Sequence, residues 1–169
     1  MDFLDLVKKR YSVRAYKPIE VEQEKIDHIL QAISLAPTAA NRQPFRIILI
    51  NTMGREAELR RIYDKDWFVQ APIIICACGV DHESWLRDDG RPTTEIDVAI
   101  VLDHLTLAAA SLGLGTCWIG AFDPVEARRI LRIPDSVTPV LFLTLGYPAD
   151  QPKIKERRQI DELVKYEYW

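Results

Sequence analysis

Apolar residues recur along the chain in two patterns, one with helical spacing and one as short continuous runs. In residues 21–36, Ile26, Ile29, Leu30 and Ile33 fall on one helical face, and Pro37 follows. This spacing predicts an amphipathic helix that ends before the proline. The polar run GREAELRRIY at 54–63 favours a short surface helix.

Four short apolar runs predict buried strands. They are RIILIN at 46–51, PIIICACGV at 72–80, TCWIG at 116–120 and TPVLFLTLGYP at 138–148. Between the last two, Asp123 as N-cap, Pro124 at the first helical position and Glu126 signal the start of another helix. This alternation predicts an α/β domain of a few strands covered by helices.

The longest helical pattern runs from Thr94 to Leu112. Thr94 and Asp97 stand at capping-box spacing at its start, and Gly113 and Gly115 follow its end. Its apolar residues occupy more than one face: Ile96, Val98, Ile100, Val101, Leu102, Leu105 and Leu107. Such a helix must be covered on several sides, which predicts a central position or a subunit interface.

Length, composition and charge limit the number of domains and the kinds of partner that we expect. The chain has 169 residues, of which 48% are hydrophobic, so we expect one domain spanning residues 1–169. A net charge of -3 argues against a general nucleic-acid or membrane-surface partner. The first residues lack a signal core and no apolar run could span a bilayer, which favours a cytoplasmic location.

Cysteine and histidine give little sign of a metal site. Cys76 and Cys78 would share one strand face and could in principle form a redox pair or half a metal site. We favour packed, reduced thiols for both and for Cys117. The three histidines show no close ligand spacing, so no metal is expected.

Near the N-terminus, Arg10, Ser12 and Arg14 alternate with Tyr11 and Val13. In an extended chain these three polar side chains point to one side, and two guanidinium groups beside a hydroxyl suit a phosphate or carboxylate. The alternative is that Arg10 complements a helix C-terminus and Arg14 is solvated. Lys155 and Arg157, in the tail, would by themselves form a solvated charge run.

The loop LAPTAANRQPFR at 35–46 is the other candidate site. The carboxamides of Asn41 and Gln43 could pair with a ring edge that alternates N–H and C=O groups, and Ala39 and Ala40 leave room for close approach. The alternative is an ordinary turn whose amides bind backbone groups. The segment GLGTCWIGAFD at 113–123 matches neither the dinucleotide fingerprint nor a P-loop.

Five motifs, taken in order, resemble the nitroreductase family of FMN-dependent oxidoreductases over nearly the whole chain. They are RYSVRAY at 10–16, APTAANRQPFR at 36–46, GLGTCWIGAFD at 113–123, LGYP at 145–148 and KIKER at 153–157. The resemblance implies a mixed, mainly antiparallel central sheet flanked by helices, in an α+β or α/β fold. It also implies an intimate homodimer with one FMN at each of two subunit interfaces, and an extended C-terminal tail at 148–169.

The resemblance also implies the cofactor contacts. The positions that match phosphate ligands are Arg10, Ser12, Arg14, Lys155 and Arg157. Those that match positions lent to the flavin by the partner subunit are Pro37, Thr38, Ala39, Asn41 and, as a weaker match, Gln43. Trp118, Ile119 and Gly120 match the stretch whose backbone lies against the flavin ring.

The implied function is ping-pong transfer of electrons from NADH or NADPH through FMN to a nitroaromatic, a quinone or a similar small acceptor. The residues identify no catalytic side chain.

Two departures from the family stand out: Ala39 and Ala40 occupy positions where serine and glycine are frequent, and the region between residues 51 and 94 is short. Two other functions stay open, an FMN-binding sensor or storage protein and a flavin-free module that binds an anionic partner.

Overall fold

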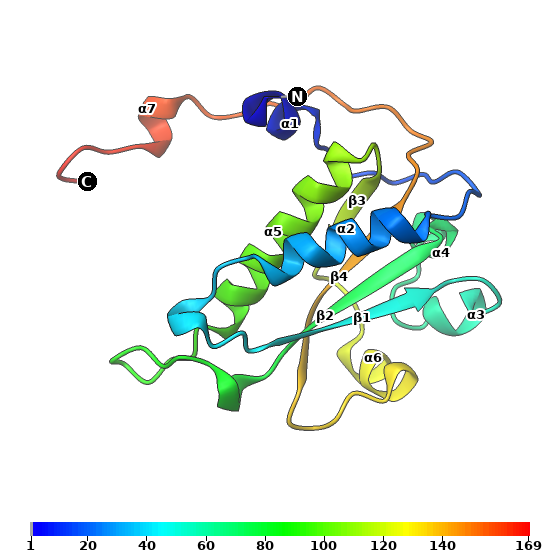
Figure 1. Cartoon of the computed structure of the whole chain (residues 1–169), viewed down its shortest axis with the longest axis horizontal. Coiled ribbons are helices and arrows are strands. Elements are labelled where there is room, and N and C mark those ends of the chain that lie inside the picture. The colour runs from blue at the N-terminus through cyan, green and yellow to red at the C-terminus, as the bar shows by residue number, and fades with distance from the viewer. Residues whose placement is uncertain (1) are drawn as a thin grey trace.

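A computed structural model describes residues 2–169 and contains a four-stranded sheet with helices on both of its faces (Figure 1). The strands are β1 (Phe45–Asn51), β2 (Ile73–Gly79), β3 (Gly115–Ile119) and β4 (Thr138–Gly146). The α-helices are α1 (Phe3–Lys9), α2 (Gln23–Ser34), α3 (Glu56–Leu59), α4 (Asp66–Gln70), α5 (Thr94–Ser111), α6 (Pro124–Leu131) and α7 (Ile160–Leu163). Two 3-10 turns are η1 (Ala39–Asn41) and η2 (Asp81–Glu83).

The strand order is β1-β2-β4-β3, and every neighbouring pair is antiparallel. An isolated parallel bridge joins Ser12 to Thr116 at the outer edge of β3. The expected mixed, mainly antiparallel sheet is therefore confirmed, with this bridge as its parallel element. The four predicted strands and the two predicted longer helices are all present.

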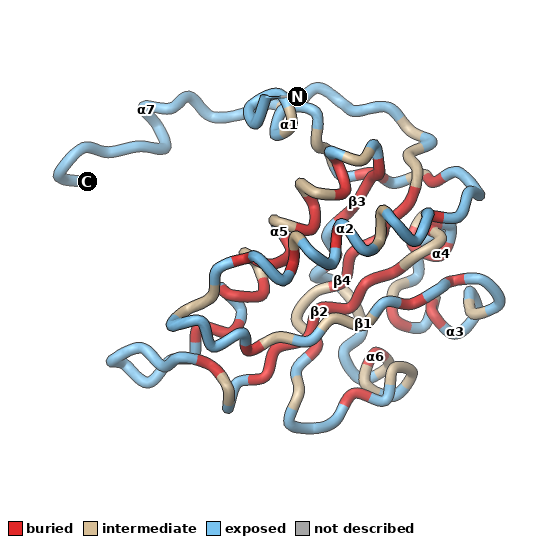
Figure 2. The backbone as a smooth tube through the Cα atoms, in the orientation of Figure 1, coloured by how far each residue is buried: buried red, intermediate tan, exposed pale blue. Residues whose placement is uncertain are grey.

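The two central strands are buried on both faces, which explains their unbroken apolar sequences (Figure 2). Ile75 and Leu143 face α2 and α5, whereas Ile74, Cys76 and Phe142 face the side covered by α3, α4 and α6. Successive residues thus enter two separate cores, as the two-residue period of a strand requires.

All three cysteines are buried, and their expected packing as free thiols is confirmed. The sulfur atoms of Cys76 and Cys78 lie 3.6 Å apart on one face of β2. The hydrogen bond with Cys78 and burial both raise the pKa of the Cys76 thiol. A raised pKa keeps a thiol protonated and unreactive at neutral pH.

Helix α5 is central, as its apolar circumference predicts. It contacts α1, α2 and all four strands. Val98, Val101, Leu102 and Leu105 are buried in these contacts, whereas Ile96 remains exposed. Part of its apolar surface is therefore left uncovered within one chain.

The expected capping role of Thr94 is wrong. The N-cap of α5 is Thr93, one residue earlier, and the Thr93 hydroxyl donates a hydrogen bond to Asp97 Oδ2 at 3.1 Å. Thr94 lies inside the helix with its methyl group against Gly79, where an added Cβ would overlap it. Its hydroxyl is buried, and no group in residues 2–169 bonds to it.

The start of α6 follows the sequence signal. Asp123 Oδ1 accepts hydrogen bonds from the backbone N–H groups of Val125 at 2.9 Å and Glu126 at 3.0 Å. Pro124, at the first helical position, has no N–H to satisfy.

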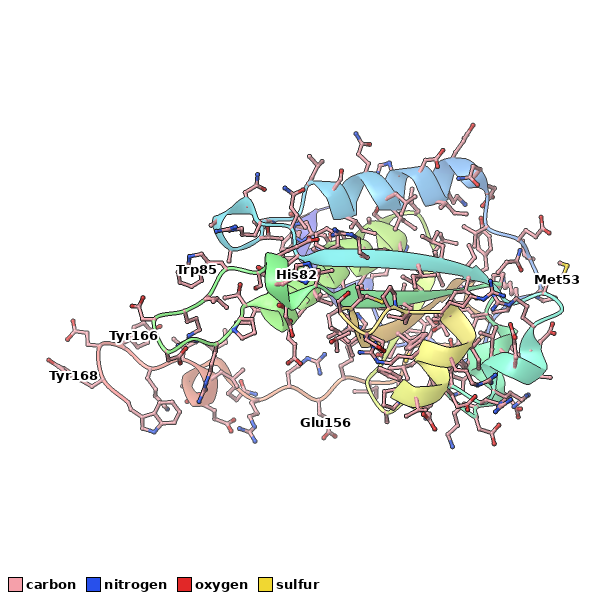
Figure 3. All side chains as sticks on the ribbon, turned by 90° about the horizontal axis from the view of Figure 1, so that it is seen from below. Met53, His82, Trp85, Glu156, Tyr166 and Tyr168 are labelled. Carbon is pink, nitrogen blue, oxygen red and sulfur yellow. The ribbon has the colours of Figure 1, made fainter. Side chains whose placement is uncertain are left out.

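The chain beyond residue 150 is extended, and its side chains are mostly exposed. Figure 3 shows Glu156, Tyr166 and Tyr168 pointing away from the body of the molecule. In the described chain no helix has both the length and the apolar character needed to span a bilayer. The single-domain organisation and the cytoplasmic location stay predictions.

A matched pair of threonine variants would test the account of α5. Thr94→Val is expected to raise the free energy of unfolding by about 1 kcal/mol, because it removes a buried hydroxyl that has no partner. Thr106→Val is expected to lower it by about 1 kcal/mol, because the Trp118 indole N–H loses its acceptor at 2.9 Å. Urea unfolding at equal protein concentration would measure both. Destabilisation by Thr94→Val would contradict the assignment.

Candidate functional site

A basic cavity lies between a segment near the N-terminus and a segment of the C-terminal tail. It has a volume of about 520 Å³ and lies between residues 10–14 and the returning tail at 150–157. Its cationic lining residues are Arg10, Arg14, Lys153, Lys155 and Arg157. The structure thus brings together two clusters that are far apart in the sequence.

The N-terminal wall of the cavity is an extended segment that follows α1. Val13 is fully buried, whereas Ser12 and Arg14 on either side of it are exposed, as the alternation predicts. The Val13 backbone N–H donates to the Thr116 carbonyl at 3.0 Å, which fixes the segment beside β3. The polar side chains therefore face the cavity while the apolar one anchors the backbone.

Asp150 ties the tail to this segment. The Tyr11 hydroxyl donates to the Asp150 carbonyl at 2.9 Å, and the Arg14 backbone N–H donates to Asp150 Oδ2 at 2.8 Å. Burial, together with the neighbouring Asp150 charge, raises the pKa of Tyr11 to about 12. The Tyr11 hydroxyl also lies 3.2 Å from Asp150 Oδ1, so both oxygens of the Asp150 carboxylate help to hold the cavity walls together.

The cationic groups of the cavity lack paired carboxylates. Within residues 2–169, no acidic side chain forms an ion pair with Arg10, Arg14, Lys155 or Arg157. Lys155 instead donates to the carbonyls of Lys8, at 2.9 Å, and Arg10. Partial desolvation and the nearby Arg10 and Arg157 charges lower the pKa of Lys155. Such a cluster favours binding of an anion, and the guanidinium forks match a phosphate.

The loop that contains η1 has an unusual backbone. Ala40, Asn41 and Gln43 have φ values of 49°, 53° and 52°, in the left-handed region that residues other than glycine rarely adopt. Gln43 Nε2 donates to the Asn41 carbonyl at 3.1 Å, so this amide now serves the turn itself. Asn41 is exposed, and Pro37 and Thr38 precede it at the end of α2.

One chain does not bring this loop to the basic cavity. The loop is held at the start of α5, where the Ala39 N–H donates to Asp97 Oδ1 at 2.8 Å. The cavity segment lies beside the opposite end of α5, against residues 113–116 (Figure 1). Gly113 is sixteen positions after Asp97, so the two regions are about 24 Å apart along the helix axis. Within one chain, the loop and the cavity are therefore two separate regions.

The third predicted group, Trp118, Ile119 and Gly120, lies on the same side of the molecule as the cavity. Ser12 bridges Thr116, and Ile119 is three residues further, or about 10 Å along β3. Because β3 is an edge strand, it retains backbone groups that no strand pairs. Trp118 is anchored by its bond to Thr106.

Other residues of the site had weak or no sequence signals. Asp150 and Lys153 line the cavity but lie in a polar tail without periodicity. The sequence indicates Asp97 only as a capping partner, because α5 also carries Glu95 and Asp103 and nothing in the sequence singles out Asp97 as the buried carboxylate.

The nitroreductase family model matches residues 7–67 and 60–147 of this chain. A Methanothermobacter thermautotrophicus protein, named provisionally as an NADH dehydrogenase/NAD(P)H nitroreductase, is 32% identical over 100% of this chain and 88% of its own length. The Bacillus subtilis FMN reductase [NAD(P)H] is 31% identical over 86% of this chain and 66% of its own length. A crystal structure of a nitroreductase family protein from Clostridium difficile superposes with a TM-score of 0.90 and 36% identity, covering 100% of both chains.

Proposed function

Because the chain belongs to the nitroreductase family, we propose that it binds FMN and passes electrons from NADH or NADPH to a small oxidised acceptor, such as a nitroaromatic or a quinone. The observation that supports this most directly is the convergence of Arg10, Ser12 and Arg14 with Lys155 and Arg157 in one cavity. The relative named FMN reductase [NAD(P)H] supports both the flavin and the electron donor.

The cavity suits the phosphate end of FMN. A phosphate monoester carries between one and two negative charges at neutral pH and has several strong acceptor oxygens. Arg10 and Arg14 supply forked N–H donors, Ser12 supplies a hydroxyl, and Lys155 and Arg157 complete the positive charge from the tail. Desolvation is the main cause of the lowered pKa of Lys155, and a bound anion would offset the repulsion from Arg10 and Arg157 that adds to it.

The ring end of FMN would lie along β3. Ile119 lies about 10 Å along β3 from the bridge between Ser12 and Thr116, Trp118 precedes it in this edge strand, and Gly120 follows the strand's last residue. The opposite side of the ring would be covered by Pro37, Thr38, Ala39 and Asn41 of the partner subunit, with Gln43 of the partner subunit as a further contact. This chain's own copies of those residues lie at the far end of α5.

When bound, FMN supplies the redox chemistry, in which a hydride arrives from the nucleotide and the electrons leave to the second substrate in a separate half-reaction. The residues of this chain bind the phosphate, orient the ring and present backbone groups to its edge. No side chain is proposed as an acid, base or nucleophile.

Exposed apolar surface supports the dimer. Ile96 on α5, and Phe3 and Leu4 on α1, are more than half exposed. The extended tail adds Ile154, Ile160, Leu163, Tyr166, Tyr168 and Trp169. A two-fold contact would cover such surface on both chains at once.

Flavin reduction is the experiment that tests the proposed function. The protein reconstituted with FMN should be yellow, and its flavin absorbance should bleach with NADH or NADPH and return on addition of menadione or a nitroaromatic. Flavin that binds but is not reduced would indicate a sensor or storage protein. Failure to bind flavin at all would favour a flavin-free module.

Arginine variants test the phosphate cavity. Arg14→Ala and Arg157→Ala should fold but bind FMN about tenfold to a hundredfold more weakly, because each removes a charge-assisted hydrogen bond. Arg158→Ala is a matched control, since Arg158 is exposed in the same tail and does not line the cavity. Fluorescence titration with FMN would measure the dissociation constants. Wild-type affinity in both cavity variants would refute the phosphate assignment.

A mixed dimer tests whether two chains share each site. One chain carries Arg14→Ala and the other carries Ala39→Trp, and each homodimer alone should bind little FMN. If the sites are shared, the mixed dimer has one site that contains both substitutions and one site that contains neither. About half of the normal FMN occupancy should therefore return. Light scattering that shows a flavin-loaded monomer would rule out this arrangement.

A further inference from the structure

Asp97 is a buried carboxylate that the proposed cofactor contacts do not use. Its side chain faces inward from the first turn of α5, and the residue is only 1% exposed. Acidic side chains are almost never buried so fully unless they are paired. Within residues 2–169, no lysine, arginine or histidine forms an ion pair with it. The cost of burying this group is therefore offset by the hydrogen bonds that it accepts.

Two hydrogen bonds reach the carboxylate from different segments. The Ala39 backbone N–H donates to Oδ1 at 2.8 Å, and the Thr93 hydroxyl donates to Oδ2 at 3.1 Å. The positive end of the α5 dipole also favours a negative group in this turn. Asp97 thus fastens the loop at 37–43 to the start of the central helix.

The loop needs such a fastening because its own backbone is strained. Ala40, Asn41 and Gln43 all adopt left-handed conformations, which are costly for residues with a Cβ atom. Other bonds of residues 37–43 are internal to the loop, such as Asn41 N–H to the Thr38 carbonyl and Gln43 N–H to Thr38 Oγ1, and the Phe45 N–H of the adjoining strand β1 donates to the Gln43 carbonyl. Asp97 provides the side-chain hydrogen bond that joins this loop to α5.

We infer that Asp97 is a positioning residue, which holds the loop at 37–43 in the strained shape that meets the flavin of the partner subunit. This inference deepens the proposed function and rests on it for the identity of the ligand. Loss of the carboxylate would let the loop relax toward ordinary backbone conformations, and the flavin would then lose contacts about 24 Å from the phosphate cavity of the same chain.

Three variants separate this role from general stability. Asp97→Leu removes both acceptors at similar volume, whereas Asp97→Asn keeps one oxygen that can accept from the Ala39 N–H. Glu24→Gln is the control, because Glu24 is exposed in the first turn of α2 and its carboxylate forms no hydrogen bond or ion pair with another described residue. Amide hydrogen exchange, FMN affinity and the visible spectrum of the bound flavin are measured on each protein.

Asp97→Leu should show faster amide exchange at residues 38–43 and an altered flavin spectrum. Its dissociation constant for FMN should rise at least about tenfold, as expected for a lost hydrogen bond to a charged acceptor. Asp97→Asn should largely restore all three readouts, and Glu24→Gln should match the wild type. Unchanged exchange and unchanged affinity in Asp97→Leu would overturn the inference. A different result would be that the wild type binds no FMN but Asp97→Leu still exchanges faster in the loop. That result would refute the proposed function, and it would show that Asp97 holds the loop in place.

If Asp97→Leu does not fold, Ala39→Pro tests the same bond from the other side, because proline removes the N–H donor and leaves the core intact. Ala39→Pro should exchange faster at residues 40–43 and bind FMN more weakly, because the N–H that donates to Asp97 Oδ1 is absent. Wild-type exchange and wild-type FMN affinity in Ala39→Pro would also overturn the inference.

Discussion

The burial of α5 is the constraint on which the rest of the molecule depends. Its apolar side chains pack against α2 on one side and against all four strands on the other, so the helix fills the larger of the two cores. Because it is rigid and 18 residues long, it also fixes the distance between its ends. One end carries the loop at 37–43 and the other supports the basic cavity, so the separation of the two half-sites follows from packing of the core.

Much of the fold could be predicted because its signals are local. The two central strands have unbroken apolar sequences, since both of their faces are buried. The start of α6 could be located because Asp123 accepts hydrogen bonds from the first turn of the helix and Pro124 occupies its first position. The strand order could not be derived from these patterns, because β2 ends at Gly79 and its partner β4 begins only at Thr138, after two helices and another strand.

The candidate site was only partly predictable. The alternation of Arg10, Ser12 and Arg14 gives their common direction, but only the fold brings Lys155 and Arg157 beside them. Thr93 rather than Thr94 is the N-cap residue of α5, and its hydroxyl bonds to the Asp97 side chain, whereas the Thr94 methyl group packs against Gly79. The left-handed conformation of Ala40 had no signal at all, since alanine ordinarily favours the right-handed helix.

The meeting of the two chain ends has a consequence for biosynthesis. Residues 10–14 leave the ribosome early, whereas residues 150–157, which close the cavity over them, are made more than 130 residues later. The pairing of Tyr16 with Pro148 and the bond from Ala149 to Ala15 also wait for that stage. The anion cavity therefore forms only after residues 150–157 have emerged, so a phosphate-bearing cofactor cannot guide the folding of the segments made before them.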